Sequence, residues 1–171
     1  KKRARDAKAI LPGVFITWTP MSRASGLDIS RLQRYLSQTI PAIGTIQSAE
    51  KFSGGQSNPT YRLHCENQDY VLRSKPPGKL LKSAHAVERE FRVMDALAGS
   101  EVPVPAVFHL CEDVNVIGSV FFIMSHENGS IYWDPALPEL NASERISLYA
   151  DEIRVLAALH SINPNRIGLS D

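Results

Sequence analysis

The spacing of apolar and polar residues changes several times along this chain, and each change marks a predicted element. Apolar side chains recur at helical spacing between residues 28 and 40, where Asp28 can act as N-cap and Pro41 ends the helix. Three strand-like runs follow, at about 45–52, 60–65 and 70–75. Because short turns join them, these runs predict an antiparallel meander rather than a βαβ unit.

The second part of the chain continues with one helix, two strands and a longer helix. These elements are predicted at about 83–98, 106–111, 120–124 and 142–160. Gly99 ends the first of these helices, and Asn141 with Glu144 supplies an N-cap and a capping-box partner for the second. The order β-β-β-α-β-β predicts an α+β fold, in which one helix packs on a five-stranded antiparallel sheet. The last helix then belongs to another structural unit.

Composition narrows the class of protein. Hydrophobic residues make up 43% of the 171, enough for a folded core, and the net charge of +1 gives no support for a nucleic-acid binder. No apolar run approaches the ~20 residues of a membrane span. Cys65 and Cys111 lack metal-ligand or CxxC spacing, so we expect reduced thiols in a cytoplasmic protein, with no membrane and no nucleic acid among its partners.

Residues 1–20 differ from the rest of the chain. A basic start precedes an apolar stretch that Pro12 and Gly13 interrupt, and no small-residue cleavage site closes it. Met21 reads as a more natural start. We therefore expect residues 1–20 to be a leader or an upstream extension outside the fold, with an amphipathic anchor as the alternative.

The clearest chemical signal is a basic strand followed by a helix that carries an acidic residue in its apolar stripe. Strand alternation places Val71, Arg73 and Lys75 on one face. Glu90 falls inside the apolar stripe of the helix, whereas Glu88 falls on its polar face. Because a buried carboxylate needs a partner, Glu90 is expected to pair with Arg73, or with Lys75 as the alternate. A solvated Glu90 at the edge of the stripe is the other possibility.

A turn with two glycines, residues 53–58, joins the first two strands. Glycine lets backbone N–H groups approach phosphate oxygens closely, and the small polar residues of this turn can add donors. The alternative is an ordinary hairpin turn, since the segment is not a GxGxxG fingerprint. The turn therefore supports phosphate binding only in combination with other features.

These segments together resemble the aminoglycoside phosphotransferase-like kinases, and most of all the subgroup related to the kinase domain fused to acyl-CoA dehydrogenases. The resemblance covers about residues 28–171, and its motifs occur in the family's order and spacing. The stretches that carry it are FSGGQSNPTY at 52–61, YVLRSKPPGKLLKSAHAVEREF at 70–91, VPVP at 102–105, FIMSHENG at 122–129 and WDP at 133–135.

The resemblance implies a protein-kinase-like N-lobe over 21–124, followed by a hinge and the start of a C-lobe over 125–171, with ATP bound beneath the glycine-containing turn. Arg73 falls at the position of the strand-three lysine that pairs with the α/β-phosphates, and Glu90 at the position of its helix glutamate. Arg departs from the Lys of many kinases and offers a bidentate fork. The implied nucleotide-binding residues are Gly54, Gly55, Gln56, Ser57, Asn58, Val71, Arg73, Glu90 and, as the hinge, Ser125, His126 and Glu127.

No catalytic residue and no metal ligand belong to this implied set. The family's catalytic loop, with an Asp that orients the acceptor and an Asn for magnesium, does not occur by Asp171, nor does the second metal-binding Asp. The resemblance therefore implies the N-terminal part of a kinase that uses ATP and magnesium, and this chain alone is expected to be inactive. A non-catalytic nucleotide-binding or regulatory module is the alternative.

The resemblance also suggests an acceptor without identifying it. In the subgroup it is a hydroxyl on an acyl-CoA-type molecule, while other members phosphorylate antibiotics, choline or homoserine. An N-lobe separated from its C-lobe would expose the apolar surface between them, so self-association of this chain is expected.

Overall fold

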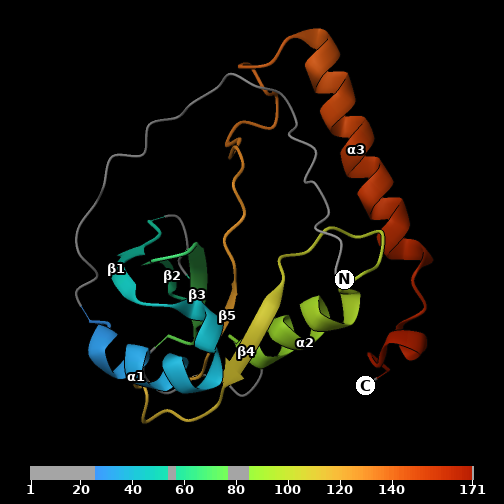
Figure 1. The fold of residues 1–171 in the computed structure, drawn as a ribbon. Coiled ribbons are helices and arrows are strands. Elements are labelled where there is room, and N and C mark those ends of the chain that lie inside the picture. The colour runs from blue at the N-terminus through green and yellow to red at the C-terminus, as the bar shows by residue number, and fades with distance from the viewer. Residues whose placement is uncertain (1–25, 54–56, 77–84, 171) are drawn as a thin grey trace.

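The computed structural model describes residues 26–53, 57–76 and 85–170. At its centre lies a five-stranded sheet in the order β1-β2-β3-β5-β4, in which every neighbouring pair is antiparallel (Figure 1). The strands are β1 (Ile46–Lys51), β2 (Thr60–Cys65), β3 (Asp69–Ser74), β4 (Val107–Cys111) and β5 (Phe121–Ser125). The predicted α+β fold with an antiparallel meander is confirmed.

Three α-helices accompany the sheet within the described ranges. They are α1 (Ile29–Thr39), α2 (Val87–Leu97) and α3 (Ala142–Ser161), with short 3-10 helices at Pro41–Ile43 and Pro164–Ile167. Asp28 caps α1 by accepting the backbone N–H of Arg31 at 3.0 Å. Asn141 and Glu144 form the capping box of α3. Both predicted helix starts are therefore confirmed.

One face of the sheet packs against α1 and forms the hydrophobic core. Leu32 and Leu36 of α1 have no exposed surface, and they belong to one apolar cluster with Leu72 and Ile123. The register pairs Leu72 with Ile123 across β3 and β5, so both side chains point to this face. The sequence predicted one helix on the sheet; α1 adds a second, because its apolar stripe needs an apolar surface to cover it.

The opposite face carries α2 over β4 and β5. Phe91 of α2 packs edge to face against Phe122 of β5, with ring centroids 6.0 Å apart. The register places Val71 and Arg73 of β3 on this same face, opposite Met124 and Phe122. The prediction that Val71 and Arg73 share a face is therefore correct.

α2 begins at Val87, later than the predicted residue 83. His85 has φ +61°, in the left-handed region, and a residue in that conformation cannot continue into a right-handed helix. Residues 77–84, which include the first part of the predicted helix, lie outside the described ranges. At its other end α2 stops at Leu97, close to Gly99, whose φ of +82° agrees with the predicted stop.

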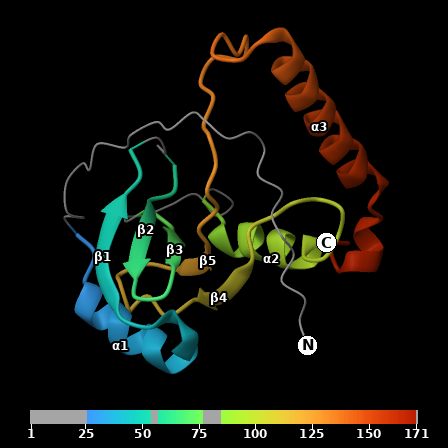
Figure 2. The same ribbon diagram turned by 45° about the horizontal axis from the view of Figure 1, so that its top comes forward.

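α3 stands apart from the sheet in both ribbon views (Figures 1 and 2). The segment after β5 leads to it without a helix or strand, and the Tyr149 hydroxyl donates to the carbonyl of Pro135 on that segment. None of the residues of α3 is buried, and Ile146 and Ile153 are 70% and 67% exposed. Among the helices of the described ranges, none combines the length and the apolar character that crossing a membrane requires.

Candidate functional site

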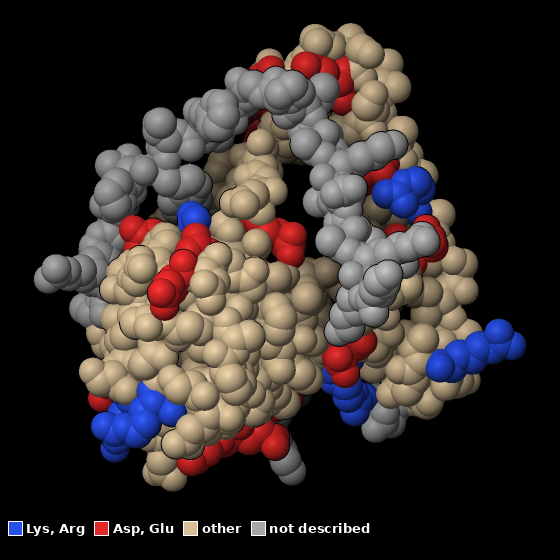
Figure 3. Space-filling view, viewed as in Figure 1, with Lys and Arg blue, Asp and Glu red and all other residues tan. Residues whose placement is uncertain are grey.

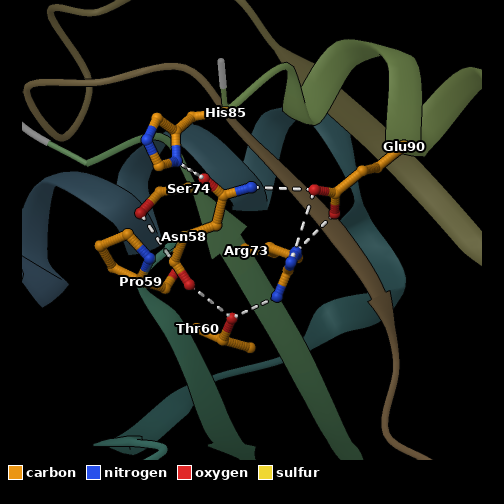
Figure 4. Close-up of polar contacts among 7 residues, drawn as sticks. All are labelled: Asn58, Pro59, Thr60, Arg73, Ser74, His85 and Glu90. Atoms are coloured by element: carbon orange, nitrogen blue, oxygen red, sulfur yellow. Dashed lines mark hydrogen bonds and ion pairs between the residues drawn. The ribbon is translucent and has the colours of Figure 1, made fainter. Parts of the chain in front are cut away.

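Arg73 on β3 and Glu90 on the first turn of α2 form an ion pair across the polar part of the sheet face (Figure 4). The Nε of Arg73 donates to Oε2 of Glu90 at 2.5 Å, and Nη2 approaches Oε1 at 3.4 Å. The guanidinium therefore contacts both carboxylate oxygens, and such a bidentate ion pair holds the arginine side chain in a defined orientation. Of the two partners predicted for Glu90, the structure gives it Arg73.

The prediction that Glu90 is buried while Glu88 stays on a solvated face is wrong. Their side chains are 35% and 33% exposed, so the two are equally half-buried. Lys75, just beyond the end of β3, forms an ion pair with Oε1 of Glu88. Helical periodicity could not indicate that Glu88 is half-buried. Lys75 extends from the sheet to the first turn of α2 and covers Glu88 on the polar face of the helix.

Asn58 and Thr60 complete a ring of hydrogen bonds around the Arg73–Glu90 pair (Figure 4). The Nδ2 of Asn58 donates to Oε1 of Glu90 at 2.8 Å, and Nη1 of Arg73 donates to Oγ1 of Thr60 at 3.0 Å. The Thr60 hydroxyl in turn donates to the backbone carbonyl of Asn58 at 3.0 Å. The end of the glycine-containing turn, β2, β3 and α2 thus meet in one polar network, to which His85 is joined through the side chain of Asn58 at 3.0 Å.

A cavity of about 510 Å³ opens on the same face of the sheet. Its apolar lining comes from Phe52, Val71, Pro105, Met124 and Ile131, and its many polar lining residues include Thr60, the hydrogen-bond partner of Arg73. A cavity of this size that combines an apolar surface with polar groups can accommodate a small organic ligand. The Arg73–Glu90 pair is joined to its wall through Thr60.

Residues 125–127 form the edge of this cavity where β5 ends. Ser125 is held in place on both sides: its Oγ accepts the backbone N–H of Ala106 at 2.9 Å and donates to Oε1 of Glu127 at 2.5 Å. The backbone N–H of Ser125 also donates to the carbonyl of Ala106 at 2.8 Å. The side chain of Ser125 is therefore occupied in fixing the local backbone.

A cluster of charged side chains lies beside the cavity on β2 and β3. Arg62 forms an ion pair with Asp69, with Nε donating to Oδ2 at 2.7 Å, and His64 lies between Asp69 and Glu50 at 3.3 and 3.4 Å. Partial burial acts to raise the pKa of Asp69, but the hydrogen bond and charge of Arg62 outweigh it, and the pKa is lowered from its ordinary 3.8. Burial lowers the pKa of His126 at the cavity edge.

The structure brings together only some of the predicted nucleotide-binding residues. Val71, Ser125, His126 and Glu127 line the cavity. Arg73, Glu90 and Asn58 meet in the adjoining polar network, and Ser57 is exposed beside it. Gly54, Gly55 and Gln56 lie outside the described residues, so the predicted contact between the glycine-containing turn and phosphate stays a prediction.

Sequence reasoning missed Thr60 and Arg62, which line the cavity from β2. Their positions follow from the hairpin register, which pairs Thr60 with Arg73 and Arg62 with Val71. The polar turn between the two strands could have given this register, because the turn fixes which residues stand opposite each other. The missing step was to infer which residues of β2 lie on the same sheet face as Val71 and Arg73.

The face of the molecule that Figure 3 shows has no strong preference for one sign of charge. In Figure 3 acidic and basic side chains are interspersed over the visible described face, and no continuous basic area stands out there. Within the described residues, no group of three or more His, Cys, Asp and Glu side chains could hold a metal ion.

Comparison with known proteins places this geometry in a family context. The model of the phosphotransferase enzyme family matches residues 48–171. A solved structure from Ralstonia eutropha, classed as an aminoglycoside phosphotransferase, is 42% identical and superposes with a TM-score of 0.73, covering 85% of this chain and 41% of that one.

Two curated relatives are much longer proteins, and both are named as acyl-CoA dehydrogenase family members. Acyl-CoA dehydrogenase family member 10 of Mus musculus is 43% identical over 145 residues, which are 84% of this chain and 14% of that protein. Acyl-CoA dehydrogenase family member 11 of Gallus gallus is 41% identical over 166 residues, 94% of this chain and 21% of that protein. The chain thus spans a minor part of each relative.

Proposed function

This chain belongs to the phosphotransferase enzyme family, and we propose that it forms the nucleotide-binding part of an ATP-dependent kinase for a small-molecule hydroxyl. Its antiparallel sheet and few helices match the N-lobe of a protein-kinase-like fold, as the sequence resemblance implied. The observation that carries the proposal is the Arg73–Glu90 ion pair next to an apolar cavity.

Arg73 is suited to hold the phosphates of a nucleotide. A guanidinium has five N–H groups, and three of them are engaged by Glu90 and Thr60 among the described residues. The two that are left can donate to phosphate oxygens while Glu90 keeps the group oriented. The planar guanidinium of an arginine matches the geometry of phosphate oxygens and can bind them through two parallel hydrogen bonds.

The cavity is suited to the base and sugar of the same nucleotide. Val71 and Met124 offer an apolar surface on the sheet face, and the backbone of His126 and Glu127 can offer donors and acceptors at the edge. Because Ser125 uses its hydroxyl on Ala106 and Glu127, we assign base recognition at this edge to backbone groups. Burial lowers the pKa of His126 from its ordinary 6.5, which favours the uncharged imidazole at the cavity edge.

ATP supplies the phosphoryl group in this proposal. The described residues of the chain bind and orient it but include no group that we assign as a base for the acceptor or as a magnesium ligand. We place those groups in the C-lobe of the full-length enzyme. We therefore expect the 171-residue chain alone to transfer no phosphate.

The acceptor that we favour is a hydroxyl on an acyl-CoA-type molecule. Support comes from the names of the relatives, which are acyl-CoA dehydrogenase family members at 41–43% identity. A kinase and a dehydrogenase that share one chain would act on related acyl compounds. We propose a cytoplasmic enzyme on the basis of reduced cysteines, because Cys65 and Cys111 are both free.

Nucleotide binding by the full-length protein tests the proposal. We expect Arg73→Met to weaken ATP binding, measured by isothermal titration calorimetry, by about tenfold to a hundredfold, as for the loss of hydrogen bonds to a charged group. Arg73→Lys should fall between, because Lys keeps the charge but has three N–H donors instead of five and lacks the planar fork.

Arg154→Met is the matched control, because Arg154 pairs with Asp151 on the exposed surface of α3. Equal ATP affinity of the wild type and Arg73→Met would contradict the proposal. ATP binding without phosphate transfer to hydroxyl acceptors by the full-length protein would instead favour a non-catalytic nucleotide-binding module.

A further inference from the structure

We propose that Asn58 and His85 are positioning residues that hold the carboxylate of Glu90 in place for Arg73. The inference rests on the proposed kinase function for its consequence, but its geometry stands on the hydrogen bonds of the described residues. It gives Asn58 a role distinct from direct contact with phosphate, and it gives a role to His85, for which sequence reasoning had none.

The side chain of Asn58 is buried and fully engaged. Only 4% of its surface is exposed, and both ends of its amide have partners. A carboxylate can only accept hydrogen bonds, so the amide nitrogen must face Glu90 and the amide oxygen must face His85. Turning this buried amide away from Glu90 and His85 would leave polar groups without partners, so its two bonds tie it to these residues.

The same logic fixes the proton of His85. Because Oδ1 of Asn58 can only accept, Nδ1 of His85 must donate across the 3.0 Å contact. The hydrogen bonds then run in one direction, from His85 through Asn58 to Glu90, and arrive on the Oε1 atom that Nη2 of Arg73 also approaches. Each donor in this chain polarises the next and strengthens the hold on Glu90.

The backbone of His85 has an unfavourable conformation that its surrounding contacts must hold in place. Its φ of +61° is unfavourable for a side chain with a Cβ, and such strain persists only where surrounding contacts hold it. Two residues later α2 begins, and its N-cap residue Ala86 supplies no side-chain cap. The first turn of α2, which carries Glu90, is therefore oriented by side chains from outside the helix, and the His85–Asn58–Glu90 chain is one of them.

Asn58 also joins this chain to Arg73 by a second route. Its backbone carbonyl accepts the Thr60 hydroxyl, which accepts from Nη1 of Arg73. A displacement of Asn58 would thus disturb both members of the Arg73–Glu90 pair.

Kinetics of the full-length protein test this inference. We expect Asn58→Ala to lower kcat by about tenfold, the effect of one lost hydrogen bond to a charged group. His85→Ala should lower kcat by less, roughly fivefold, because His85 bonds the neutral amide of Asn58. The change in KM for ATP should be smaller in both variants because the cavity is untouched. The double variant should be no worse than Asn58→Ala, because both residues act in one chain. Ser74→Ala is the control: Ser74 is equally buried and bonds the carbonyl of Pro59, but it does not touch Glu90.

His85→Gly separates the side chain from the backbone. Glycine adopts φ +61° without strain but lacks the imidazole. If the imidazole acts through Asn58, His85→Gly and His85→Ala lose the same activity. Wild-type activity in His85→Gly would overturn the role given to His85.

Asn58→Asp adds a readout that loss of folding cannot imitate. The new carboxyl faces Glu90 and His85, and Arg73 approaches the same Oε1 atom of Glu90. When ionised it repels Glu90, and when protonated it can donate to Glu90 as the amide does. We expect the pH profile of kcat to shift toward acid in this variant only, and an unchanged profile with full activity would contradict the inference.

A nuclear magnetic resonance measurement distinguishes failure of this inference from failure of the proposed function. In the wild type the Nε–H proton of Arg73 should be protected from exchange by Glu90, and Asn58→Ala should remove that protection while Ser74→Ala keeps it. A protein that neither binds nor hydrolyses ATP would refute the proposed function, yet this measurement would still decide the network. Unchanged protection in Asn58→Ala would overturn the inference whatever the activity.

Discussion

Lys75 and Glu88 form a second ion pair between the sheet and α2, next to that of Arg73 and Glu90. Glu88 and Glu90 both belong to the first turn of α2, where the positive end of the helix dipole also favours carboxylates. The two pairs therefore attach the start of α2 to the end of β3 at two points. This attachment matters because the helix has no side-chain cap of its own.

We expect Lys75→Met to destabilise the fold without removing nucleotide binding. The change leaves the half-buried carboxylate of Glu88 without its cation, and Oε2 of Glu88 already lacks a hydrogen-bond partner among the described residues. The loss in the free energy of unfolding should be about 1–2 kcal/mol, between the values for exposed and for buried ion pairs. Urea unfolding measures it, with Arg154→Met as the exposed control. If Lys75→Met lost as much ATP affinity as Arg73→Met, the assignment of Lys75 to stability and of Arg73 to nucleotide binding would be contradicted.

Periodicity and turn chemistry were enough to predict the sheet and its helices, because each depends on local patterns. The predicted strands fall within one or two residues of β1 to β5, and the capping residues Asp28 and Asn141 mark the starts of α1 and α3. The start of α2 was missed because a left-handed residue, His85, carries no sequence signal that distinguishes it from a helical histidine.

The site was predictable in part for the same reason. The alternation of β3 and the apolar stripe of α2 pointed to Arg73 and Glu90, and both lie where the resemblance implied. Lys75 was predicted only as the alternate partner of Glu90, and Glu88 as a residue of the polar face, so their ion pair was missed. The bond from Asn58 to Glu90 was also missed, because both contacts depend on how distant elements approach each other. Such approaches are set by tertiary packing and cannot be derived from the period of one element.

The ion pair of Asp69 with Arg62 predicts a pH-dependent contribution to stability. Arg62 lowers the pKa of Asp69 below its ordinary 3.8, so the pair stabilises the fold above that pH and the contribution is lost as the pH falls through the lowered pKa. We expect Asp69→Asn to cost about 1 kcal/mol at pH 7, as for a partly exposed pair. The difference from the wild type should shrink only below pH 3.8.

Urea unfolding of both proteins from pH 7 down into the acid range measures this difference. Glu139→Gln serves as control, because Glu139 is exposed and lies outside the charged cluster. A difference between wild type and Asp69→Asn that stayed constant at all pH values would show that Asp69 contributes through packing rather than charge.

Ser125→Ala should weaken ATP binding although its side chain is not assigned to the base. The change removes the acceptor for the N–H of Ala106 and the donor to Glu127, so the backbone at the cavity edge loses two constraints. Losing about 1 kcal/mol of preorganisation corresponds to roughly a fivefold rise in Kd. Calorimetric titration of the full-length protein measures it. Val107→Ala, a change on β4 outside the cavity lining, is the comparison, and an unchanged Kd in Ser125→Ala would place base recognition elsewhere.

We expect the 171-residue chain to self-associate through the apolar side of α3. Ile146, Ile153 and Leu156 are 70%, 67% and 51% exposed, and no described residue covers them. Burying one such side chain contributes about 1.5–3 kcal/mol, so Ile153→Asp should weaken association at least about tenfold. Sedimentation velocity over a range of concentrations measures it. Ser147→Asp adds the same charge to α3 without removing apolar surface and should associate like the wild type, whereas a wild-type chain that stays monomeric at the highest concentration would contradict the prediction.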